Sequence, residues 1–289
     1  MHSLPRYLVA LITPFSADGD LDLAAHQHNV SVLWDAGIRG FVIGGSNGEG
    51  PYLEPGERHD LLSSARDVLG PGGHLMCGVM AETVRSAFRQ LAETATGGAD
   101  TVLSLTPTTL ARNRTEVVER FFTEVADEST LPVVLYSVPN TTAYSLPEEA
   151  VARLSMHPNI VGMKDSSGDP VRMQRLVEAT PKDFVLWSGS SQALTLAVTA
   201  GAHGVITGSG NYVPGLVLET LAAARQDPLA ARAVQTRLSQ VSRAVEGHGI
   251  PAVKAASVVA GLRIGIPRLP LTPVADQLAQ ELQNAVRTI

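Results

Sequence analysis

The sequence has 289 residues, 44% of them hydrophobic and 17% charged, and its formal net charge is −6. This length allows a large buried core, and the acidic balance without a Lys/Arg run argues against nucleic acid or a membrane surface as a partner. Cys77 is the only cysteine, which excludes an internal disulfide, and we find no signal peptide or transmembrane span. We therefore expect a cytoplasmic protein that acts on small molecules.

Short apolar runs rich in β-branched residues recur at fairly even spacing, and each has the length of a buried strand. There are eight: YLVALIT (7–13), GFVIGG (40–45), HLMCGV (74–79), DTVLSLT (100–106), PVVLYSV (132–138), NIVGMK (159–164), FVLWSG (184–189) and HGVITG (203–208). The segments between them have helical periodicity, as at 23–37, 83–98 and 114–128.

Capping residues mark the ends of several of these helical segments. The candidates are Asp22, Thr83, Asn113 and Asp169 at the starts, and Gly37, Gly70 and Gly97 at the ends. Strand then helix, repeated eight times, predicts a (β/α)8 TIM barrel. An open doubly wound sheet is the competing fold, but no GxGxxG follows the first run, and eight strands favour closure.

The pattern changes after residue 225, because residues 226–289 contain no strand-like run. They read as roughly three helices, and PRLPLTP (267–273) separates the last two because its prolines forbid a regular helix. We predict a catalytic barrel domain at 1–225 and a C-terminal helical region at 226–289.

Lys164 lies at the end of the sixth run, and active sites of such barrels lie at the carboxyl ends of the strands. Alternation predicts that Ile160, Gly162 and Lys164 share the interior face, while Val161 and Met163 pack under a helix. An amine confined in the barrel mouth loses solvation, which favours its neutral form, a nucleophile that gives a Schiff base with a carbonyl carbon. The alternative is that the strand has ended and Lys164 is in water.

Two neighbouring features suit the same chemistry. Tyr136 ends the fifth run, and its phenol can transfer protons if it faces the mouth. Taken alone, the residue is better explained as a core or interface tyrosine with a satisfied hydroxyl. In GGSNGEG (44–50), four glycines bracket Ser46 and Asn47, so that backbone N–H groups can form a nest for a carboxylate. Ser46 could bridge this carboxylate to Tyr136, and Glu49 is expected to brace the loop; the alternative is a plain glycine-rich turn.

Other polar candidates point less clearly to chemistry. The hydroxyl-rich turns at 188–191 and 207–211 follow strands seven and eight, where many barrels hold a phosphate, so a phosphorylated substrate stays open. We find no HExxH motif and no cluster of His, Asp and Glu at the strand ends, so we do not expect a metal site. We expect His26 and His28 to face solvent and Lys254, the nearest rival nucleophile, to be structural.

Seven motifs occur in an order that resembles the dihydrodipicolinate synthase / N-acetylneuraminate lyase family over nearly the whole chain. They are ITPF (12–15), GSNGE (45–49), LTP (105–107), YSVP (136–139), GMKDSSGD (162–169), GAHGVITG (201–208) and RLPLTP (268–273). The resemblance implies class I chemistry, in which a lysine forms a covalent imine with pyruvate or another 2-oxo acid, without metal or another cofactor.

The resemblance also implies the roles of individual residues. Lys164 matches the Schiff-base lysine and Tyr136 the proton-transfer tyrosine. Ser46 and Asn47 match the carboxylate-binding pair, and Ile206 lies where a backbone carbonyl faces the substrate. The family commonly forms homo-oligomers, so we expect a dimer or a dimer of dimers, that is, a homotetramer.

Five positions depart from the family patterns. Thr141 lies where the synthase pattern has an arginine that holds a second carboxylate. Thr108 and Thr109 replace tyrosines, one of which serves as a proton relay to a neighbouring subunit. Ser190 and Ser191 replace acidic residues with which the sialic acid lyases hold sugar hydroxyls. These departures disfavour both condensation with aspartate semialdehyde and sialate cleavage.

We therefore predict a class I lyase that forms or cleaves a bond between pyruvate and an aldehyde, closest to the 4-hydroxy-2-oxoglutarate aldolase branch and acting on a 4-hydroxy-2-oxo acid. Ser166, Thr141 and Gly189 complete the expected substrate site, with Ser166 as a candidate for contacting aldehyde hydroxyls. The alternatives are a dihydrodipicolinate synthase-type condensation, a sugar-acid (2-keto-3-deoxy acid) aldolase or dehydratase, and a weakly catalytic 2-oxo-acid binding protein.

Overall fold

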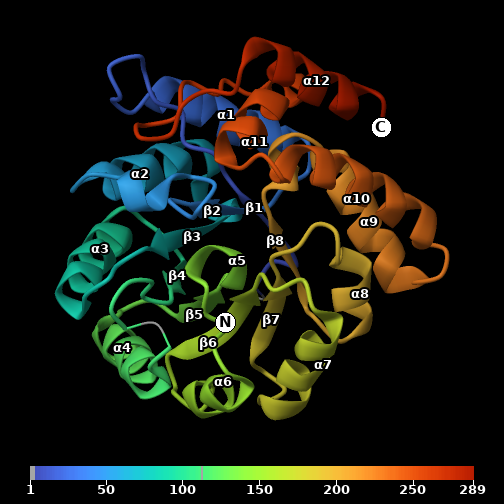
Figure 1. Cartoon of the computed structure of the whole chain (residues 1–289). Coiled ribbons are helices and arrows are strands. Elements are labelled where there is room, and N and C mark those ends of the chain that lie inside the picture. The colour runs from blue at the N-terminus through green and yellow to red at the C-terminus, as the bar shows by residue number, and fades with distance from the viewer. Residues whose placement is uncertain (1–3, 112) are drawn as a thin grey trace.

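Eight parallel strands close into a barrel in chain order, as Figure 1 shows. The computed structural model describes residues 4–111 and 113–289. The strands are β1 (Tyr7–Ala10), β2 (Gly40–Ile43), β3 (His74–Val79), β4 (Thr101–Leu105), β5 (Val133–Ser137), β6 (Ile160–Asp165), β7 (Val185–Ser188) and β8 (Gly204–Thr207). Seven of the predicted runs contain a whole strand, the sixth contains all of β6 except Asp165, and β1 pairs with β8 to close the barrel. The predicted (β/α)8 fold is confirmed.

Helices surround the barrel and continue beyond it. The α-helices are α1 (Leu23–Asp35), α2 (Glu57–Leu69), α3 (Val84–Thr96), α4 (Thr115–Glu128), α5 (Pro139–Thr142), α6 (Glu148–Leu154), α7 (Pro170–Ala179), α8 (Leu194–Thr199), α9 (Pro214–Gln226), α10 (Arg232–Glu246), α11 (Ile250–Ser257) and α12 (Asp276–Arg287). Short 3-10 turns are η1 (Gly50–Tyr52), η2 (Gly70–Gly72), η3 (Ser209–Asn211) and η4 (Val258–Ala260). None of the helices within the described ranges is long and apolar enough to cross a membrane.

Three of the four predicted N-caps act as caps. The side chains of Asp22, Thr83 and Asp169 accept hydrogen bonds from backbone N–H groups in the first turns of α1, α3 and α7. The prediction for Asn113 is wrong, because α4 begins after Arg114 and Asn113 has a left-handed backbone with φ 65°. Asparagine tolerates that conformation better than most residues, which explains its place in this turn.

Apolar side chains from alternate positions fill the interior of the barrel. They are Leu8, Val42, Met76, Leu103, Leu105, Val134, Tyr136, Trp187 and Ile206. A second apolar layer lies between the strands and the helices, and it contains most of the buried apolar residues. The interior layer places Tyr136 directly beneath the mouth, as alternation in β5 predicts.

Strand β6 departs from simple alternation at its first residues. Ile160 packs with Met163 in the outer layer, whereas Val161 packs against the barrel interior, so the predicted faces of Ile160 and Val161 are wrong. The cause is a register shift, since Val133 pairs with Ile160 but Val134 pairs with Gly162. The irregularity ends before Gly162, so the prediction for the end of the strand is unaffected.

The C-terminal helices α10, α11 and α12 cover one side of the barrel in Figure 1, beside α9 and α1. The three helices agree in number with the prediction, and η4 extends α11 by a short turn. Their apolar faces share one buried cluster with α1, α2, α9 and the strands near them. The division at residue 225 stays a prediction.

Candidate active site

Lys164 and Tyr136 face each other at the mouth. They are paired residues of the neighbouring strands β6 and β5. Lys164 is only 5% exposed, which contradicts the alternative that it ends the strand in water, and its Nζ lies 4.3 Å from the centroid of the Tyr136 ring. Burial acts to raise the pKa of Tyr136, but the positive charge of Lys164 and hydrogen bonds from its neighbours outweigh it, so the pKa lies below its ordinary value.

The loop after β2 brings Ser46 to the same place, with its Oγ 3.4 Å from the hydroxyl of Tyr136. Gly44 makes the turn with φ 63°, a conformation that favours glycine. Thr13 Oγ1 donates a 2.7 Å hydrogen bond to the carbonyl of Gly48 and so fixes the loop to the end of β1. Among the described residues, no hydrogen bond engages the N–H of Ser46 or Asn47.

Asn47 and Ile206 lie on the side of the mouth formed by β8. The Asn47 amide packs so closely on Gly208 that a Cβ there would come 2.9 Å from its nitrogen. Ile206 is fully buried in the barrel interior beside Leu8 of β1. Asn211 holds this corner together, because it accepts from the N–H of Ile12 and donates to the carbonyl of Gly208.

Ser166 and Gly189 complete the wall next to Lys164. A Cβ at Gly189 would come 1.8 Å from the Ser166 hydroxyl and 3.0 Å from Cε of Lys164, so only glycine fits. The N–H of Gly189 donates to the carbonyl of Asp165 at 2.7 Å, and that of Ser166 to Ser137 at 2.9 Å. The structure thus brings together Lys164, Tyr136, Ser46, Ser166 and Gly189.

Asp165, which the sequence analysis did not single out, anchors the same strand end from behind. Its buried carboxylate lies 2.8 Å from Nε of Arg172, and Arg172 also donates to the carbonyl of Leu146 at 2.6 Å. Ser167 donates to Asp165 through both its N–H and its hydroxyl. The KDSS sequence alone does not distinguish this structural carboxylate from a substrate ligand, since its partner Arg172 lies on the following helix.

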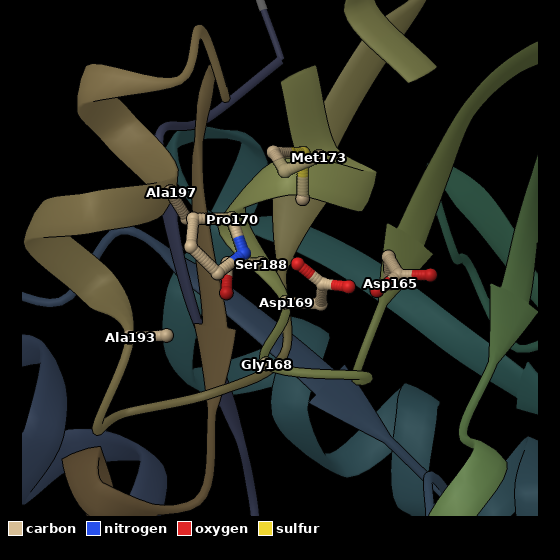
Figure 2. Close-up of a pocket in the computed structure, with 8 residues that line it drawn as sticks. All are labelled: Asp165, Gly168, Asp169, Pro170, Met173, Ser188, Ala193 and Ala197. Atoms are coloured by element: carbon tan, nitrogen blue, oxygen red, sulfur yellow. The ribbon is translucent and has the colours of Figure 1, made fainter. Parts of the chain in front are cut away.

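Figure 2 shows the hollow beside this anchor, between the loop after β6 and helix α8. It is lined by Asp165, Gly168, Asp169, Pro170, Met173, Ser188, Ala193 and Ala197. Lys164 is not part of the lining, and Asp169 caps α7 there. The hollow is therefore a packing feature outside the active site.

The threonines that depart from the family pattern lie at the rim. Thr108 and Thr109 donate their N–H groups to the carboxylate of Glu82, at 3.0 and 2.9 Å. Burial acts to raise the pKa of Glu82, but these hydrogen bonds outweigh it and lower the pKa below its ordinary value. Thr141 is exposed in the one-turn helix α5, where its N–H donates to the carbonyl of Val138 at 2.9 Å. Glu82 had no recognisable signal in the sequence.

Lys254 is buried but is engaged elsewhere. Its Nζ lies 2.5 Å from Oε1 of Glu49 and donates to the carbonyl of Ile266 at 2.8 Å. The other oxygen of Glu49 accepts from the N–H of Arg268 at 2.8 Å. Glu49 braces the loop after β2, as expected, by joining it to the C-terminal region.

The histidine expectation requires correction. His26 is 1% exposed, and its Nδ1 lies 2.9 Å from Oγ of Ser64. His28 is half-buried, with Nε2 3.0 Å from the carbonyl of Gly261. The helix that carries them packs on both α2 and the C-terminal region, which the sequence period did not reveal. Within residues 4–111 and 113–289, no group of three His, Cys, Asp or Glu could hold a metal ion.

A buried lysine beside a tyrosine at the mouth of a (β/α)8 barrel, next to a glycine-rich loop, defines the class of Schiff-base aldolases. Residues 3–289 match the dihydrodipicolinate synthetase family, and the chain belongs to it. A 4-hydroxy-tetrahydrodipicolinate synthase of Nitrosospira multiformis is 32% identical over 282 residues, 96% of this chain and 93% of the relative. Another, of Xanthomonas axonopodis pv. citri, is 35% identical over 288 residues, 96% and 95% of the two chains.

Solved structures agree with this assignment. A dihydrodipicolinate synthase of Bacillus anthracis superposes with a TM-score of 0.94 at 27% identity and covers 100% of this chain and 99% of its own. A dihydrodipicolinate synthase of Acinetobacter baumannii, complexed with pyruvate, gives 0.91 at 28% identity over 99% and 98%. The protein is accordingly a carbon–carbon lyase of the class I, pyruvate-dependent group, which uses a Schiff-base lysine and no metal cofactor.

Proposed function

We propose that Lys164 is the Schiff-base lysine and Tyr136 the proton-transfer residue of this enzyme. The observation that carries the proposal is the position of the Lys164 amine, 4.3 Å from the Tyr136 ring, with Ser46 3.4 Å from the tyrosine hydroxyl. The lowered pKa of Tyr136 suits a phenol that gives up and regains a proton during the reaction.

The loop after β2 would hold the carboxylate of pyruvate. Ser46 and Asn47 have uncommitted N–H groups at a tight glycine turn, which is a typical anion nest. A carboxylate bound there would place the C2 carbonyl towards Lys164, because Ser46 already touches Tyr136. Ile206 would present its backbone to the substrate from β8.

The reaction follows from the chemistry of the imine. The amine of Lys164 attacks C2 of pyruvate, and loss of water gives a protonated imine that withdraws electrons. Loss of a proton from C3 then gives an enamine, whose C3 attacks the carbonyl carbon of an aldehyde to form the new C–C bond. Hydrolysis of the product imine returns the free lysine. In the opposite direction, the C3–C4 bond breaks and releases the aldehyde.

For the acceptor aldehyde, the relatives favour the predicted alternative over the main prediction. The curated relatives described above are all 4-hydroxy-tetrahydrodipicolinate synthases, so condensation with aspartate semialdehyde is the first candidate. A 4-hydroxy-2-oxo acid aldolase is the second, and the rim favours it, because Thr141, Thr108 and Thr109 replace the arginine and tyrosines of the synthase pattern.

Ser166 and Gly189 are proposed to line the aldehyde half of the site. The Ser166 hydroxyl lies against Gly189 and next to Lys164, so it can hydrogen-bond a hydroxyl on C4 of the adduct. Thr141, at the exposed rim, would meet only a longer aldehyde. A homo-oligomer, whether dimer or dimer of dimers, and a cytoplasmic location are part of the same proposal.

The test has two stages. Sodium borohydride in the presence of pyruvate should trap an adduct on the protein; the absence of an adduct at high pyruvate would overturn the Schiff-base proposal. Turnover is then compared between pyruvate with aspartate semialdehyde and a panel of 4-hydroxy-2-oxo acids. Faster turnover in the first assay assigns the synthase reaction, and faster cleavage in the second assigns the aldolase. Trapping without turnover in either would favour a binding protein.

A further inference from the structure

Glu246 carries a partly buried carboxyl group next to the active site that the proposed reaction does not use. It is the last residue of α10 and lies beside the loops that follow β7 and β8. Oε1 of Glu246 accepts a 2.9 Å hydrogen bond from Oγ of Ser191 and a 3.1 Å hydrogen bond from the hydroxyl of Tyr212. Both donors are buried, so water does not compete for these contacts.

A chain of hydroxyl groups extends this contact across both loops. Oγ of Ser191 lies 2.9 Å from Oγ of Ser209, which lies 3.0 Å from Oγ1 of Thr207. The four groups, Thr207, Ser209, Ser191 and Glu246, join the end of β8, the loop after β7 and the end of α10. A single carboxyl thus links two barrel strands to a helix of the C-terminal region.

The two loops form walls of the substrate site. Ser191 follows two residues after Gly189, where a Cβ would come 3.0 Å from Cε of Lys164. Ser209 follows Gly208, on which the amide of Asn47 packs. A shift of either hydroxyl would therefore move a residue that touches the reacting lysine or the carboxylate loop.

The position of Glu246 costs stability, which indicates a functional reason for it. A negative charge at the last residue of a helix opposes the helix dipole, and a partly buried carboxylate loses part of its hydration. Burial raises the pKa of Glu246, whereas the hydrogen bonds of Ser191 and Tyr212 and the positive charge of Lys164 oppose the rise.

We propose that Glu246 is a positioning residue: by accepting hydrogen bonds from Ser191 and Tyr212, it holds the loops after β7 and β8 in place around the Schiff base. This rests on the proposed function of Lys164. Glu246 acts through Ser191 and does not touch the substrate. A glutamine could accept the same two hydrogen bonds, whereas a leucine could accept none.

The experiment compares Glu246→Leu, Glu246→Gln and Ser191→Ala with the wild type, and Glu219→Gln, an exposed glutamate on the neighbouring helix α9, is the control. In Glu246→Leu, the KM for pyruvate should rise about tenfold, since small displacements in a site have large effects. Ser191→Ala removes the hydrogen bond between Glu246 and the loop after β7, so the KM for pyruvate should rise about threefold. In Glu246→Gln, the KM should stay within about twofold of the wild-type value.

The split between KM and kcat separates positioning from a general loss of structure. A displaced loop weakens the binding of pyruvate, so kcat at saturating pyruvate should stay within about threefold of the wild-type value in Ser191→Ala and Glu246→Leu. Wild-type KM values in Glu246→Leu and Ser191→Ala, or a rise of the KM by about tenfold in Glu246→Gln, would overturn the proposal. If Glu246→Leu does not fold, the KM values of Ser191→Ala and Glu246→Gln test the proposal instead. A wild-type protein that traps no pyruvate would instead overturn the proposed function.

Discussion

Two buried lysines in this protein solve the problem of a buried amine in different ways. Lys254 is 1% exposed, and its Nζ meets the carboxylate of Glu49 at 2.5 Å. Lys164 is 5% exposed, and within the described part of the chain no carboxylate comes within 4.0 Å of its nitrogen. Its neighbours are the ring of Tyr136 and a set of hydroxyl groups.

The difference shows that burial alone does not identify a nucleophile. The ion pair favours the charged form of Lys254, and burial, which lowers the pKa of Lys254, is opposed by Glu49. Within the described residues, the amine of Lys164 has no carboxylate within 4.0 Å, so no ion pair has to break before it attacks a carbonyl carbon. The following predictions test this contrast, from the largest expected effect to the smallest.

Replacement of Lys164 should have the largest effect on activity. Lys164→Ala removes the nucleophile, so turnover should fall about 10⁴-fold or more, and pyruvate should no longer be trapped. Lys182→Ala, at an exposed position, is the control and should keep wild-type turnover. A trapped adduct in Lys164→Ala would place the nucleophile elsewhere.

Tyr136→Phe tests the role of the tyrosine hydroxyl next to Lys164. The variant keeps the ring against Lys164 but removes the hydroxyl, so kcat should fall about 10²- to 10⁴-fold with the fold unchanged. Tyr144→Phe, a buried tyrosine that bonds Thr115 outside the site, is the matched control. Equal kcat values for the two variants would exclude Tyr136 from proton transfer.

Lys254→Met should affect stability and leave the chemistry intact. It strands the carboxylate of Glu49 without its cation, so the free energy of unfolding should fall by about 3–5 kcal/mol in urea titrations. The double variant with Glu49→Gln removes the stranded charge and should regain part of this loss. If Lys254→Met instead abolished trapping, the contrast between the two lysines would be wrong.

His26 provides a third solution, in which a buried base stays neutral. Burial lowers the pKa of His26 to about 4, below the ordinary value of 6.5. The unfolded chain therefore binds the proton more tightly, and stability is lost as the pH falls from 6.5 to about 4, by on the order of 3 kcal/mol. His26→Gln should flatten this part of the pH dependence in urea titrations, whereas His59→Gln, at an exposed position, should not.

The barrel and the centre of its site could be predicted because both follow from local patterns. Each apolar run marked a strand, and strand ends gather at one face of a barrel, which brought Lys164, Tyr136 and Ser46 together. The alternation failed only at Ile160 and Val161, where the strand pairing shifts by one residue. A register shift depends on the neighbouring strand and has no signal in the run itself.

The supporting contacts could not be predicted, because their partners are distant in the sequence. Glu82, in the loop after β3, accepts a hydrogen bond from Thr108, in the loop after β4. Glu246 accepts a hydrogen bond from Ser191 and lies on a helix outside the barrel. Charged residues on helices usually face water, so sequence reasoning assigns Glu246 to the surface. Glu82 does lie in an exposed loop, and only its bonding partner has no signal in the sequence. His26 was misplaced for the same reason, since the partner that buries it lies on α2.

Peptide mapping of the trapped adduct tests the central claim most directly. The chain has three lysines, Lys164, Lys182 and Lys254, so mass spectrometry after reduction with borohydride and pyruvate can assign the adduct to one position. We predict that the mass of pyruvate, less one water and plus two hydrogens, is found on Lys164 alone. An adduct on Lys254, despite its bond to Glu49, or on exposed Lys182 would contradict the account.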